Sequence, residues 1–102
     1  MTSAPTHLKA PTRRWYADVL RDYDLEPHHE RLLQAAAEAW DRLQESRVTL
    51  RKDGTYIDGR YGKRAHPAVA VERDSRTAFA RLIRELDLDS EPSPDPRPPR
   101  RR

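Results

Sequence analysis

One stretch of the chain, residues 27–50, constrains the fold more than any other, because it holds no glycine and no proline after its first residue. It is rich in alanine and leucine, which have the highest helix propensities. Pro27 suits the first position of a helix, so we predict one long helix over 27–50. Its apolar residues recur at nearly 3.5-residue spacing, interrupted by Arg47, and its alanine-rich face suits packing on another helix, within the chain or between copies. These residues are Leu33, Ala36 or Ala37, Trp40, Leu43 and Leu50.

Two further segments show an apolar stripe at helical period. The first covers residues 13–23, with Thr12 as its expected N-cap, and Pro27 marks the break that follows it. The second begins at Pro67 and runs to about residue 86. Its stripe consists of Val69, Ser75, Ala78, Phe79, Leu82, Ile83 and Leu86.

The segment between the second and third helices contains all three glycines. Asp53-Gly54 and Asp58-Gly59 are turn dipeptides around the strand-like residues 55–57. The predicted fold class is therefore mainly α, with three helices, two of them long, and a short glycine-containing loop or small β-hairpin over residues 52–66. We expect a flexible N-terminus (1–11), a helical domain (12–88), and a disordered tail rich in proline and arginine (89–102).

The core of this chain is small, since only 35% of its 102 residues are hydrophobic and 36% are charged. Such a chain often completes its core against copies of itself. Trp15 and Trp40 fit either core positions or anchors for a partner, and core is the favoured interpretation. The pattern leaves open which helix faces are core and which lie between subunits. The expected core or oligomer residues are Trp15, Leu33, Trp40, Leu43, Phe79, Leu82, Ile83 and Leu86.

No group of residues in the sequence indicates catalysis. There is no cysteine, no phosphate-binding GxxxxGK[ST] loop and no HExxH zinc motif. His28 and His29 are adjacent, so on a helix their side chains diverge by about 100° and do not easily share a metal. We therefore expect no enzyme activity, no metal and no cofactor. The absence of a long apolar run or a signal sequence predicts a cytoplasmic protein without a membrane partner.

The positive charge is concentrated in one short segment. Residues 51–66 carry five basic and two acidic side chains, so the net charge of this segment equals the net charge of the whole chain, +3. Such a patch suits phosphate contacts, although a solvated loop explains it equally well. Arg13 and Arg14 occupy the first turn of a helix, where the macrodipole disfavours cations, so they are further candidates, or merely exposed arginines. The candidate DNA-binding residues are Arg13, Arg14, Arg51, Lys52, Arg60, Lys63 and Arg64.

Several segments, in this order and spacing, resemble the small subunit of the phage terminase. They are Trp15-Tyr16-Ala17-Asp18-Val19, Tyr23-Asp24-Leu25-Glu26, Leu32-Leu33, Ala35-Ala36-Ala37-Glu38-Ala39, Asp41-Arg42, His66-Pro67-Ala68-Val69, Arg73-Asp74-Ser75-Arg76 and Arg81-Leu82-Ile83-Arg84-Glu85-Leu86. Members of this family often show glycine after the last Glu-Leu, where this chain has Asp87.

The resemblance implies a ring-forming, non-catalytic adaptor of a phage or prophage, working in the bacterial cytoplasm. It would recognise viral double-stranded DNA and present it to the large terminase subunit, the ATPase and nuclease, for genome packaging. The subunit number, the DNA site and the role of the tail stay open. The alternatives are a small helix-turn-helix transcription regulator, which would be a dimer, and a scaffold that binds only protein.

Overall fold

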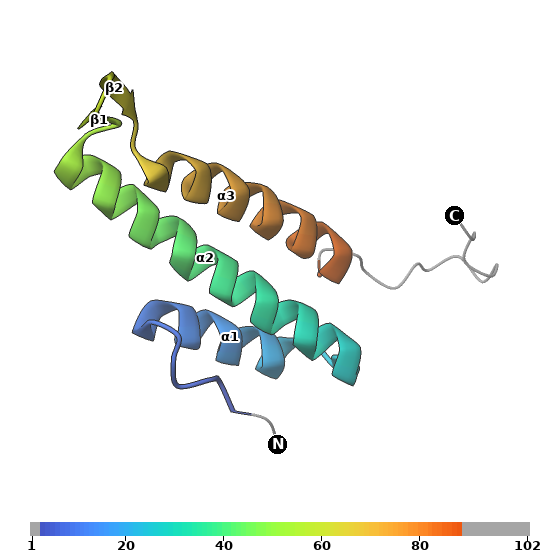
Figure 1. The fold of residues 1–102 in the computed structure, drawn as a ribbon. Coiled ribbons are helices and arrows are strands. Elements are labelled where there is room, and N and C mark those ends of the chain that lie inside the picture. The colour runs from blue at the N-terminus through green and yellow to red at the C-terminus, as the bar shows by residue number, and fades with distance from the viewer. Residues whose placement is uncertain (1–2, 89–102) are drawn as a thin grey trace.

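The computed structural model describes residues 3–88 and contains three helices and one hairpin. The elements are α1 (Ala10–Asp22), α2 (Pro27–Asp53), β1 (Tyr56–Gly59), β2 (Gly62–Ala65) and α3 (Pro67–Leu86). In Figure 1, α2 is the long central element, with α1 along its N-terminal part and α3 running back beside it from the hairpin. The predicted mainly α class is confirmed, and a small β-hairpin occupies the 52–66 segment. The predicted disordered tail lies outside the described residues.

The first helix begins earlier than the sequence indicated. α1 begins at Ala10, with Lys9 as its N-cap and proline in its first turn. Proline is favoured there because its missing N–H would have no helical partner. The assignment of Thr12 as the N-cap was therefore wrong. The helix also includes residues 10 and 11, and Leu8 before it is buried in the core.

Asp41, in the middle of α2, takes over the capping of α1. One carboxylate oxygen accepts a hydrogen bond from the Lys9 backbone N–H at 2.9 Å, and the other accepts one from the Thr12 hydroxyl at 2.5 Å. Asp41 is only 8% exposed and Thr12 4% exposed. A negative charge also suits the N-terminus of a helix. Asp41 therefore fixes the start of α1 against α2.

The core lies where α1 and α3 meet the same part of α2. Leu33, Ala36 and Ala37 are completely buried there, and Tyr16 from α1 and Leu86 from α3 pack against them. Burial raises the pKa of the Tyr16 phenol, and the negative charge of Glu30 raises it further. The side chains of Trp15, Phe79, Leu82 and Ile83 are half-buried around this core.

Helices α2 and α3 form a long antiparallel pair (Figure 1). Leu43 is buried on α2, and the buried small residues Ala39, Ser46 and Ser75 allow the two helices to approach closely. α2 extends to Asp53, three residues beyond the predicted end, and stops at Gly54, whose φ is 86°. The helix therefore ends at a glycine with positive φ and not at its last apolar residue, Leu50, where the prediction ended it.

The predicted third helix agrees with the observed α3 (Pro67–Leu86). It ends at Asp87, which adopts the left-handed conformation with φ 54° and ψ 43°. Among the described residues it is the one non-glycine residue with positive φ. Position 87 therefore has the backbone conformation that glycine adopts most readily, although the chain places aspartate there.

Replacing the aspartate by glycine tests this account of the helix end. We expect Asp87→Gly to raise the free energy of unfolding by about 0.5–1 kcal/mol, because glycine lacks the Cβ that opposes the left-handed conformation. Urea unfolding measures it. As a control, Arg81→Gly in the exposed middle of α3 should lower stability by about 1 kcal/mol. Equal destabilisation by both variants would contradict this explanation.

A second substitution tests the cap that Asp41 supplies. Asp41→Ala leaves the Thr12 hydroxyl and the Lys9 N–H without their carboxylate, so stability should fall by about 1–3 kcal/mol. Thr12→Val removes one of the two donors, and its effect should be much smaller when alanine already stands at position 41. Chemical unfolding of the four members of this double-mutant cycle measures the coupling. Strict additivity would show that the two side chains do not interact.

Candidate nucleic-acid interface

Five of the seven predicted DNA-binding residues gather at the hairpin end of the molecule. Arg51 and Lys52 lie in the last turn of α2, next to the strands. The three others belong to the hairpin itself, and all five side chains are exposed. We call these residues the hairpin cluster: Arg51, Lys52, Arg60, Lys63 and Arg64.

The two remaining candidates lie elsewhere. Because α1 begins at Ala10, Arg13 and Arg14 are its fourth and fifth residues and lie at and just beyond the first turn, not within it as predicted. Both are exposed, and this end of α1 is held at the level of Asp41. From Asp41 to Arg51, α2 rises by about 15 Å. The structure therefore does not bring Arg13 and Arg14 into the hairpin cluster.

The hairpin projects its loop away from the helices (Figure 1). Gly59 pairs with Gly62 at the end of the ladder, so Arg60 and Tyr61 form the two-residue loop. A Cβ added to Gly59 would lie 2.9 Å from the Gly62 carbonyl oxygen and 3.1 Å from Cδ of Arg64. The aliphatic part of Arg64 therefore covers Gly59, and this close approach requires a residue without a side chain.

Only part of the positive charge in the cluster is neutralised. Lys63 Nζ lies 3.3 Å from Asp58 Oδ1 on the opposite strand, but both side chains are more than 70% exposed. An ion pair so open to solvent contributes little stability, typically less than about 1 kcal/mol. Lys63 can therefore exchange this carboxylate for a phosphate at small cost.

Tyr61 is a candidate contact residue that the sequence analysis missed. Its side chain is 94% exposed, and the guanidinium carbon of Arg60 lies 5.7 Å from the centre of its ring. An exposed aromatic ring among cations is able to stack on a nucleic-acid base or sugar. The sequence contained a sign of this exposure, because Tyr61 stands in a dipeptide between two glycines. At the end of a hairpin such a dipeptide has few residues to pack against.

His66 holds the base of the hairpin to both long helices. Its Nδ1 accepts a hydrogen bond from the Ala68 backbone N–H at 3.0 Å, which caps α3. Its Nε2 lies 3.1 Å from a carboxylate oxygen of Asp53, the last residue of α2. Because Nδ1 is an acceptor, Nε2 carries the ring proton and donates it to this carboxylate. The backbone N–H of His66 also donates to Thr55. This histidine therefore sets where the strands leave the bundle.

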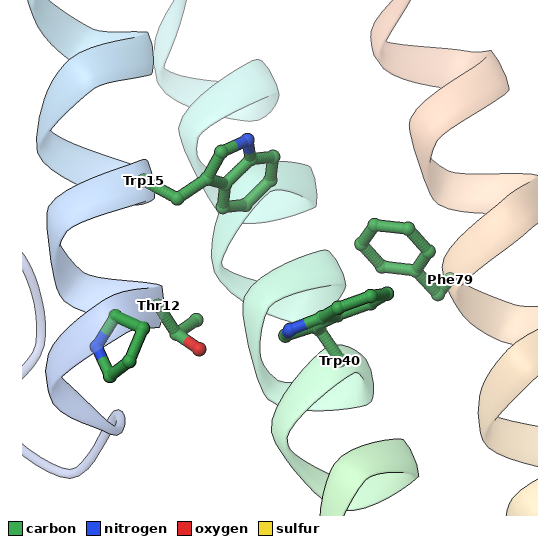
Figure 2. A pocket seen from close by; sticks show the side chains of 5 residues that line it. Thr12, Trp15, Trp40 and Phe79 are labelled. Atoms are coloured by element: carbon green, nitrogen blue, oxygen red, sulfur yellow. The ribbon is translucent and has the colours of Figure 1, made fainter.

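Seven of the eight expected core or oligomer residues are buried or half-buried. Leu33, Leu43 and Leu86 are buried, whereas Trp15, Phe79, Leu82 and Ile83 are half-buried. Trp40 is 37% exposed and so lies outside the core of the single chain, and its burial between copies stays a prediction. Figure 2 shows Trp15, Trp40 and Phe79 converging from three different helices around a pocket.

Residues 3–88 contain neither a membrane-spanning helix nor a metal-binding cluster. None of the helices in this range has the length and apolar character needed to cross a membrane. Over the same range, no cluster of three or more histidine, cysteine, aspartate or glutamate side chains is arranged to hold a metal ion.

Comparison with known proteins identifies a family that covers most of the chain. Residues 13–92 match the family model described as phage terminase, small subunit. This range includes all three helices except the first three residues of α1, and it covers the whole hairpin. No curated protein and no solved structure matches the chain.

The close approach at Gly59 gives a test of the hairpin that spares the bundle. In Gly59→Ala the new methyl group would collide with the Gly62 carbonyl, so the strand pairing should be lost while the helices stay folded. Amide hydrogen exchange of residues 56–65 measures the pairing, and thermal unfolding measures the bundle. Tyr61→Ala, at the exposed tip, is the control and should keep the pairing. Protected strand amides in Gly59→Ala would contradict this assignment.

Proposed function

Because the chain belongs to the phage terminase small-subunit family, we propose that it is the DNA-binding adaptor of a packaging machine. In this role it recognises viral double-stranded DNA and presents it to the large terminase subunit. That partner supplies the ATPase and nuclease, and the present chain acts without catalysis or a cofactor. The setting is the cytoplasm of a bacterial host that carries the phage or prophage.

The observation that carries the DNA-binding part is the geometry of the hairpin cluster. Its five cations are exposed at one end of the molecule, on and beside a hairpin whose loop points outward. A β-hairpin of this size fits a DNA groove, and its arginines and lysine suit the flanking phosphates. We assign the cations of the cluster to phosphates, which supply affinity and salt dependence, and Tyr61 at the tip to the bases.

Self-assembly is the second part of the proposal. Val48 on α2 is 53% exposed and Val71 on α3 is 40% exposed. Val71 lines a surface hollow together with Ala39 and Arg42 of α2 and Ala78 of α3. We assign this outer face of the α2–α3 pair to contacts between copies in a ring. A ring would set several hairpins side by side and multiply weak phosphate contacts through avidity.

Removing the charges of the hairpin tests the DNA contact. The triple variant Arg60→Gln, Lys63→Gln and Arg64→Gln should bind double-stranded DNA more weakly and flatten the dependence of log K on log salt by up to about 3 units, because three phosphate contacts are lost. Glutamine keeps part of the Arg64 stem that covers Gly59. Fluorescence anisotropy in a salt series measures both quantities.

A matched control removes three exposed arginines away from the hairpin, Arg31, Arg81 and Arg84. It lowers the net charge equally, so a similar loss in both variants would show that total charge, not the hairpin, governs binding. Light scattering on the purified protein tests the assembly. A particle larger than a dimer supports the ring, whereas a dimer would favour the helix-turn-helix regulator.

A further inference from the structure

A pocket between the three helices is the strongest feature that the proposed function leaves unused. Its volume is about 410 Å³, and its lining residues are Pro11, Thr12, Trp15, Trp40 and Phe79. The centre of the Phe79 ring lies 5.0 Å from that of Trp40 and 6.4 Å from that of Trp15, and the ring planes are tilted by 49° and 54°. Figure 2 shows the three rings spread around the opening rather than stacked shut. We call this feature the aromatic groove.

The polar atoms of the groove also bear on its occupant. Figure 2 shows the indole nitrogen of Trp40 at the end of the ring that lies toward Thr12. An indole N–H donates only, so a matching ligand would combine an apolar surface with free acceptors. A polyproline II segment has both, since its ring surfaces are apolar and its backbone carbonyls make no internal hydrogen bonds.

The chain itself carries a segment of this chemistry. Prolines stand at 92, 94, 96, 98 and 99, and residues 96–99 read Pro-Arg-Pro-Pro. A polyproline II helix has three residues per turn, so Pro96 and Pro99 share one face. Aromatic-lined grooves recognise proline-rich PxxP segments in several unrelated domains. We propose that residues 96–99 of the chain's own tail dock in the aromatic groove.

The length of chain beyond the described residues suits this docking. Phe79 lies about 10 Å from the end of α3 along the helix axis. The eight residues from Leu88 to Pro96 span up to about 25 Å in an extended proline-rich conformation. The tail therefore reaches the groove of its own molecule with length to spare. A tethered segment of this kind acts at an effective concentration near 1 mM, so modest intrinsic affinity is enough.

The tryptophans make the proposal measurable in the full-length protein. The chain has two tryptophans, and both line the groove. The double variant Pro96→Ala, Pro99→Ala should shift their fluorescence to longer wavelength and make them more accessible to acrylamide. The control, Pro92→Ala with Pro94→Ala, removes as many prolines outside the PxxP segment and should leave both readouts at the wild-type value. Circular dichroism should show the same helix content in all three proteins.

A peptide of residues 89–102 provides the reciprocal measurement. Added to the Pro96/Pro99 variant at about 1 mM, the tail's expected effective concentration, it should restore the wild-type fluorescence. Wild-type emission should not change on dilution. Identical spectra for wild type and the Pro96/Pro99 variant, or an equal shift in the control, would overturn the proposal. Wild-type emission that changes with protein concentration in step with the mass seen by light scattering would assign the groove to a second copy instead, and would leave the DNA-binding proposal intact.

Discussion

The packing of α2 against a helix on each side is the interaction on which the rest of this structure depends. Leu33, Ala36 and Ala37 have no exposed surface, and they bring α1 and α3 close to one part of one helix. Alanine side chains permit this approach, but they contribute little buried area themselves. The larger contributions come from Tyr16 and Leu86 on the flanking helices. The arrangement leaves the far end of the α2–α3 pair free to hold the hairpin, and it leaves three aromatic rings around an open groove.

The long helices could be predicted because local signals and tertiary packing agree there. Pro27 and Pro67 begin α2 and α3, and apolar residues at helical period face the core. The role of Asp41 could not be predicted, because its two hydrogen-bond donors lie far from it in the sequence. They are the Lys9 backbone N–H, just before α1, and the Thr12 hydroxyl within it. The position of Asp41 gave a hint, because it continues the buried line from Leu33 and Ala37 at four-residue spacing. Trp40 lies beside that line, which explains its exposure.

The candidate interface was predictable to a similar degree. A count of charges located the hairpin cluster, because consecutive residues on a short hairpin necessarily lie near one another. Arg13 and Arg14 were added because of the macrodipole, and their distance from the cluster could not be predicted because it depends on how far α1 lies along α2. Tyr61 was overlooked because an aromatic residue is usually assigned to a core, whereas here the Gly59–Gly62 pair places it in the loop.

The attachment of the hairpin through His66 has a consequence for how such a chain can diversify. The hydrogen bonds of this residue fix the base of the strands, while the residues at the tip touch none of the core. Mutations at positions 60 and 61 therefore change surface chemistry without disturbing the hydrophobic packing. Selection can act on the tip dipeptide almost independently of selection for folding, so related viruses would be able to alter what the protein contacts while inheriting the same helical scaffold.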